Sequence, residues 1–85
     1  MTTVSLSSHE VRILLDDLCV RLGFCLPPAE RMRLCEAPPA DTRSFTDAVF
    51  HAEGLDPATA DLHLYRQVRA RVARAFFESA GERDQ

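Results

Sequence analysis

The sequence is 85 residues long, 46% hydrophobic and 27% charged, and its formal net charge is −3 with arginine but no lysine. A chain of this size and composition makes one small domain with a thin core, and it is too apolar for a disordered protein. It has no stretch apolar enough to span a membrane, and residues 1–8 lack the basic and apolar regions of a signal peptide. We therefore expect a cytoplasmic protein. The absence of lysine beside abundant arginine and alanine points to a GC-rich bacterial or phage genome.

The first predicted helix covers residues 8–22. Ser7 and Glu10 have the spacing of a capping box, in which each side chain accepts a hydrogen bond from the backbone N–H of the other residue. Gly23 suits the left-handed residue that ends a helix, and Phe24 can fold back on the last turn. The buried face is indicated by apolar residues at the helical period: Val11, Leu14, Leu15, Leu18, Cys19 and Leu22.

The second predicted helix covers residues 28–36, because Pro27 and Pro28 break the chain and proline fits the first turn of a new helix. Its core candidates are Met32, Leu34 and Cys35. The third covers residues 44–53, after possible capping residues at 41–44 and before Gly54. Its core candidates are Phe45, Ala48, Val49 and Ala52.

The last predicted helix covers residues 57–79, with Asp56 as its N-cap and Pro57 as its first residue. We expect frayed ends at residues 1–6 and 80–85. No run of alternating β-branched residues indicates a strand. The predicted fold is therefore all-α, a bundle of four helices of which the first and last are longer. The core face of the last helix is Leu64, Tyr65, Val68, Val72, Ala75 and Phe76.

Neither a metal site nor a catalytic site is indicated. Structural zinc needs ligands two to four residues apart, and neither the three cysteines (19, 25 and 35) nor the three histidines have that spacing. The odd number of cysteines without a secretory signal favours reduced thiols, with those at 19 and 35 in the core. Asp16 and Asp17 are adjacent and point in different directions on a helix. We predict no enzyme and no cofactor.

Charge is distributed unevenly along the chain. Residues 1–61 carry a net charge of −5, whereas residues 62–85 carry +2, with four arginines and no acid between Leu62 and Phe77. The last two helices resemble a helix-turn-helix in order, which makes nucleic-acid binding one hypothesis. It is the weaker one, because the first predicted turn of the last helix (58–61) has an acid and no arginine, and the chain as a whole is acidic.

The stronger hypothesis is a protein–protein contact on the side of the last helix that faces away from its core stripe. A phenylalanine among arginines and alanines is typical of an interface anchor, whereas Arg69 and Arg71 border the core stripe as solvated flanks. Ile13 and Val20 mark a similar second stripe on the first helix. The predicted contact residues are Leu62, Arg66, Ala70, Ala73, Arg74 and Phe77, together with Ile13 and Val20.

We interpret the chain as a small interaction module, that is, an adaptor, a regulator or an inhibitor of the immunity-protein type. The partner is another protein or a second copy of the chain, and a homodimeric structural domain is the further alternative. The alternative without a partner is that the second stripes of the first and last helices are covered within the monomer, by Val4 and Leu6 or by the region of Leu26 and Met32.

Overall fold

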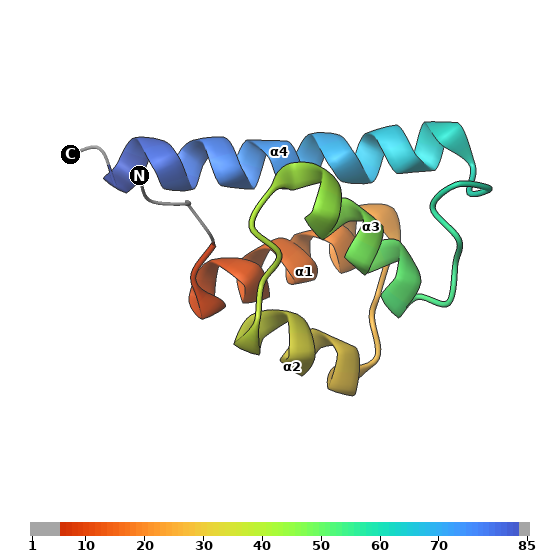
Figure 1. The fold of residues 1–85 in the computed structure, drawn as a ribbon, viewed down its shortest axis with the longest axis horizontal. Coiled ribbons are helices and arrows are strands. Elements are labelled where there is room, and N and C mark those ends of the chain that lie inside the picture. Colours follow the sequence, from red (N-terminus) through yellow and green to blue (C-terminus); the bar gives the residue numbers. More distant parts are fainter. Residues whose placement is uncertain (1–5, 84–85) are drawn as a thin grey trace.

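The computed structural model describes residues 6–83, which form four helices and no strand: α1 (Ser8–Leu22), α2 (Pro28–Glu36), α3 (Thr42–Ala52) and α4 (Leu62–Arg83). The predicted all-α bundle is therefore confirmed. α4 is the longest helix and lies along one side of the bundle. The other three helices lie together on one side of α4 (Figure 1). α1 and α3 pack against α4, and α2 packs against α1.

α1 begins and ends at the predicted residues because both of its caps form. The backbone N–H of Glu10 donates to the Ser7 Oγ at 3.1 Å, and the N–H of Ser7 donates to the Glu10 carboxylate at 2.7 Å. Gly23 ends the helix with a φ of 70°, a conformation that costs glycine little, and the N–H of Phe24 returns to the Leu18 carbonyl at 3.1 Å. α2 also has the predicted bounds.

α4 begins five residues after its predicted start at Pro57. The Asp56 carboxylate accepts a hydrogen bond from the N–H of Ala58 at 3.0 Å, which closes a local turn and not a helix. Asp61 takes the capping role instead, since its carboxylate accepts from the N–H of His63 at 2.8 Å. The sequence offers two aspartates that compete as N-caps, and the prediction chose the wrong one.

The other boundaries differ by a few residues. Asp41 accepts a hydrogen bond from the N–H of Ser44 at 2.8 Å, so α3 begins at Thr42 and not at residue 44, and it ends one residue before its predicted end. α4 continues to Arg83, four residues beyond the prediction. Leu6, expected in a frayed end, is only 3% exposed. The remaining residues expected to fray, 1–5 and 84–85, lie outside the described residues.

The core lies between α4 and the three shorter helices. Phe50, which the sequence did not mark, is fully buried, and its ring lies 4.9 Å from that of Phe24 and 5.2 Å from that of Tyr65. The prediction of a buried Met32 is wrong, because α2 turns only a narrow side to the core and this residue is 62% exposed. The buried apolar residues are Leu6, Val11, Leu14, Leu15, Leu18, Phe24, Leu26, Leu34, Phe45, Val49, Phe50, Val68 and Val72.

Candidate functional site

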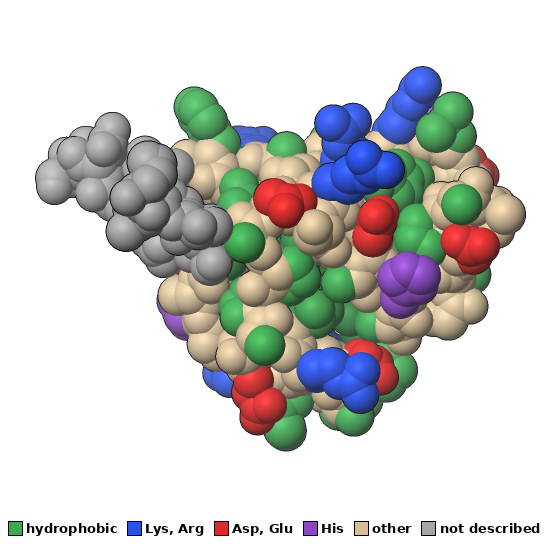
Figure 2. All heavy atoms as spheres, in the orientation of Figure 1, with side chains coloured by type: hydrophobic (Ala, Val, Ile, Leu, Met, Phe, Trp, Pro, Cys, Tyr) green, Lys and Arg blue, Asp and Glu red, His purple; other side chains and the backbone are tan. Residues whose placement is uncertain are grey.

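The predicted contact residues of α4 all lie on the exposed side of that helix. We call this set the outer face of α4. Its two large apolar side chains, Phe77 and Leu62, are 79% and 60% exposed. Figure 2 shows basic side chains along the ridge that α4 forms at the top of the view, with hydrophobic side chains toward both ends of the ridge. The outer face consists of Leu62, Arg66, Ala70, Ala73, Arg74 and Phe77.

The outer face is exposed because it is the opposite side of α4 that packs into the core. Val68 and Val72 are fully buried, and at about 100° per residue Phe77 points away from both of them. A phenylalanine side chain contributes about 1.5–3 kcal/mol when it is fully buried. Since Phe77 is mostly exposed, most of this free energy is not used in folding.

Of the four residues named as possible covers, three are described, and none of these three covers the outer face of α4. Leu6 and Leu26 are buried in the core, and Met32 is itself exposed. Val4 lies outside the described residues. Within residues 6–83, the outer face of α4 is therefore uncovered.

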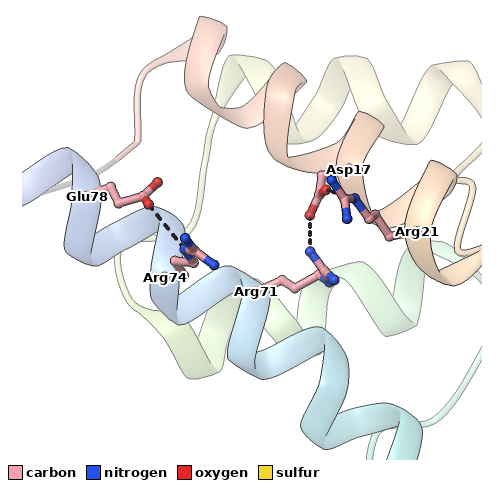
Figure 3. Close-up of polar contacts among 5 residues, drawn as sticks. All are labelled: Asp17, Arg21, Arg71, Arg74 and Glu78. Carbon is pink, nitrogen blue, oxygen red and sulfur yellow. Dashed lines mark hydrogen bonds and ion pairs between the residues drawn. The ribbon is translucent and has the colours of Figure 1, made fainter.

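The arginines of α4 differ in their partners. Arg66 and Arg69 are exposed and make no ion pair with any described residue. Arg74 contacts Glu78, one turn further on, with 3.2 Å between its Nε and the carboxylate (Figure 3). Both side chains of this pair are mostly exposed, and such pairs contribute only about 0.3–0.5 kcal/mol. The outer face thus keeps cationic groups that no strong internal partner neutralises.

Arg71 has a different role from the solvated flank that the sequence predicted. Its guanidinium donates to the Asp17 carboxylate of α1 at 2.9 Å, and both side chains are about one-third exposed. Arg21, one turn along α1, approaches the same carboxylate at 3.4 Å, so Asp17 lies between two guanidinium groups (Figure 3). This contact joins α1 to α4 and makes Arg71 part of the fold.

Asp16 and Asp17 point in different directions, and each contacts a different helix. The Asp16 carboxylate pairs with Arg31 of α2, whereas the Asp17 carboxylate pairs with Arg71 of α4. Two adjacent acids of α1 thereby hold the neighbouring helices on either side. Both carboxylates therefore contribute to the packing of the helices.

A groove of about 670 Å³ runs between α1 and α4 beside these ion pairs. Its lining mixes both signs of charge with apolar surface, and it includes Ile13, Asp17, Arg74 and Glu78. The side chain of Ser79, also in the lining, is 2% exposed, and its hydroxyl has no hydrogen-bond partner among the described residues. With its balanced charges, the groove has no feature that selects one class of small ligand.

The exposed stripe of α1 does not merge with the outer face of α4. Ile13 is 55% exposed and lines the groove, as does Arg74 of α4. Val20 is 81% exposed, but it is not part of the groove lining. Six of the eight predicted contact residues therefore share one exposed side of α4, with Ile13 in the neighbouring groove and Val20 apart from it.

The prediction of three reduced thiols is wrong for two of the cysteines. Cys19 and Cys25 form a disulfide, with 4.3 Å between their Cα atoms, and only Cys35 is free. The left-handed Gly23 reverses the chain between them, which brings the exposed Cys25 back beside the last turn of α1. Reduced thiols would have agreed with the expected cytoplasmic location, and the disulfide removes that agreement.

Tyr65 links α4 to α3 at the edge of the core. Its hydroxyl donates to the Asp47 carboxylate at 2.8 Å. Burial, together with this hydrogen bond and the negative charge of Asp47, raises the pKa of Tyr65 above its usual value of 10.0. The bond fixes the side of α4 that faces α3, and therefore also the direction of the outer face.

The described part of the chain contains neither a helix long and apolar enough to cross a membrane nor a group of three or more His, Cys, Asp or Glu side chains placed to hold a metal ion. No protein-family model, curated protein or solved structure matches this chain.

Proposed function

We propose that this chain is a small protein–protein interaction module that binds its partner through the outer face of α4. The observation that supports this function is Phe77, 79% exposed on a helix whose opposite side carries the fully buried Val68 and Val72. Large aromatic side chains and arginines are the residues that contribute most to protein interfaces. Ala70 and Ala73, exposed between the large side chains, permit close approach of a partner.

A protein partner suits this geometry better than nucleic acid does. The connection between α3 and α4 covers residues 53–61, which is longer than the three- or four-residue turn of a helix-turn-helix. The arginines of the outer face also share it with two large apolar side chains, whereas phosphate contacts come mainly from basic and polar groups.

The test of the proposed function distinguishes loss of the partner contact from loss of folding. Phe77→Ala and Arg66→Glu change exposed positions, so we expect the free energy of unfolding to stay within about 0.5 kcal/mol of the wild type. Both variants should lose the partner in affinity purification from the source cells with chemical crosslinking. Met32→Ala is the matched control, since it removes another large apolar side chain that is mostly exposed, on α2, and should keep the partner.

Two results would contradict the proposal. Retention of the same partner by both α4 variants would show that the contact lies elsewhere. A collapse of thermal melting in Phe77→Ala would show that this side chain is buried in the native protein. Circular dichroism of each variant distinguishes these two results.

A further inference from the structure

We propose that the partner is an acidic amphipathic helix that lies lengthwise along the outer face of α4. This inference rests on the proposed function and specifies the chemistry of the partner. It is carried by three features of α4: the shape of the exposed strip, the charge beside it, and the way α1 already docks on the same helix.

The shape of the strip fits a helix. Leu62 and Phe77 are 15 residues apart, which is about 22 Å at 1.5 Å per residue, and their large exposed side chains stand at its two ends. Between them lie Ala70 and Ala73, which let a second helix approach to the short end of the usual 8–10 Å between helix axes. Residues 6–83 contain no strand, so they offer no sheet edge to which an extended peptide could add.

The charge of this side of α4 specifies an acidic partner. Arg66 and Arg74 belong to the outer face, Arg74 at one edge of it, and at about 100° per residue Arg69 borders the opposite edge. Glu78 is the one acid among the described side chains of α4, which leaves three positive charges against one negative charge. Arg66 and Arg69 have no ion-pair partner among the described residues. Carboxylates that border an apolar stripe on the partner would meet these groups.

The same charge disfavours a second copy as the occupant. Contact between two outer faces would bring together two surfaces that each carry a net charge of +2, and like charges at an interface oppose association. The exposed stripe of α1 is not acidic enough to serve instead. Arg12 lies beside it, and the Asp16 carboxylate is already paired with Arg31.

The molecule contains its own example of the proposed contact. α1 is an amphipathic helix packed against α4, and it presents Asp17 to Arg71 at 2.9 Å beside its buried Leu14 and Leu18. An α4 arginine that faces another helix is thus met by a carboxylate at the edge of an apolar stripe. The partner would repeat this arrangement on the other side of α4.

The test uses selection from a display library of helical peptides of about 22 residues in which the surface positions are randomised. The full 85-residue chain is the target. We expect the selected helices to carry an apolar stripe and net negative charge, and to bind in the weak, transient range of small interfaces. Phe77→Ala should weaken their binding about tenfold or more, whereas Met32→Ala should leave it unchanged.

Charge reversal on α4 is the most direct test of whether the partner is acidic. The double variant Arg66→Glu, Arg69→Glu turns the net charge of this side of α4 from +2 to −2. The same selection against this variant should enrich helices of net positive charge. Both positions are exposed, so this arm does not depend on whether Phe77→Ala folds.

The outcomes separate this inference from the proposed function. Selected peptides that lose binding on Phe77→Ala but show no preference for acidic residues would overturn the acidic helix and keep the interaction surface. Selected peptides that ignore both α4 variants would overturn both. Two further results would replace the acidic helix with another occupant: a dimer in sedimentation that Phe77→Ala dissociates, or duplex DNA binding at about 50 mM salt that Arg66→Glu abolishes and Phe77→Ala spares.

Discussion

Removal of the Tyr65 hydroxyl tests how α4 is held to α3. In Tyr65→Phe the ring remains, with its contact to Phe50 at 5.2 Å, and only the 2.8 Å hydrogen bond to Asp47 is lost. A bond to a charged acceptor stabilises a fold by about 1.5–3 kcal/mol, and partial exposure of this one reduces the value. We expect the free energy of unfolding at neutral pH to fall by about 1–1.5 kcal/mol, or roughly 4–8 °C in Tm for each kcal/mol in a domain of this size.

The pH dependence of this loss follows from the raised pKa of Tyr65. Burial and Asp47 raise that pKa in the folded state above 10.0, whereas the unfolded chain releases the same proton near pH 10. The stabilising contribution is therefore fully present below about pH 10 and is lost as the pH rises through the pKa of the folded state. At high pH the wild type should lose stability relative to Tyr65→Phe, which has no proton to release there.

The assay is unusually direct because Tyr65 is the only tyrosine and the chain has no tryptophan. Tyrosinate absorbance against pH gives the pKa of this one group, and urea unfolding at neutral and alkaline pH gives the free energies. Asp47→Asn is the matched control, since it should return the pKa toward 10.0 without changing the ring. An unshifted titration together with equal stability of Tyr65→Phe would refute the account of this contact.

Three further predictions concern other contacts of the bundle. Reduction of the Cys19–Cys25 disulfide should lower the free energy of unfolding by about 2 kcal/mol, as expected for so short a loop, and alkylation of the unreduced, unfolded protein should label one cysteine and not three. A double-mutant cycle with Asp17→Asn and Arg71→Gln should give a coupling of about 0.5–1 kcal/mol, and no coupling would mean that this pair does not join α1 to α4. The pKa of Asp41 lies below 3.8 because its carboxylate accepts hydrogen bonds as the cap of α3. Its stabilising effect is therefore present at neutral pH and is lost as the pH falls through that pKa. Asp41→Asn should keep the cap, and urea titrations should show that the free energy of unfolding of this variant depends less on acid pH.

The fold was largely predictable because its boundary signals are local. The Ser7–Glu10 box and Gly23 act within one turn of the chain, and both form as the sequence predicts. The start of α4 was not predictable from such signals, since Asp56 and Asp61 both have the chemistry of an N-cap. Which of them caps the helix depends on how the segment between α3 and α4 packs, and propensity does not contain that information.

The site was predictable only where a single helix determines it. The outer face of α4 follows from periodicity within one helix. Arg71 was misassigned because its partner, Asp17, is 54 residues away and no spacing rule connects them. The disulfide had a signal that was not used: Cys19 and Cys25 flank Gly23, whose left-handed turn reverses the chain and brings the two cysteines together.

The length of α4 explains how this helix can serve the core and still keep one whole side exposed. Its 22 residues span about 33 Å, against about 22 Å for the 15 residues of α1, and all three shorter helices lie on one side of it (Figure 1). Folding requires only the sector of α4 that carries Val68 and Val72, so the opposite side is free to vary without cost to the core. A phenylalanine 79% exposed at that position contributes little to folding, and the proposed contact with a partner would give it a physical role. For the same reason, substitutions at Phe77 and Arg66 should separate binding from stability, whereas those at Tyr65 or Arg71 should alter stability.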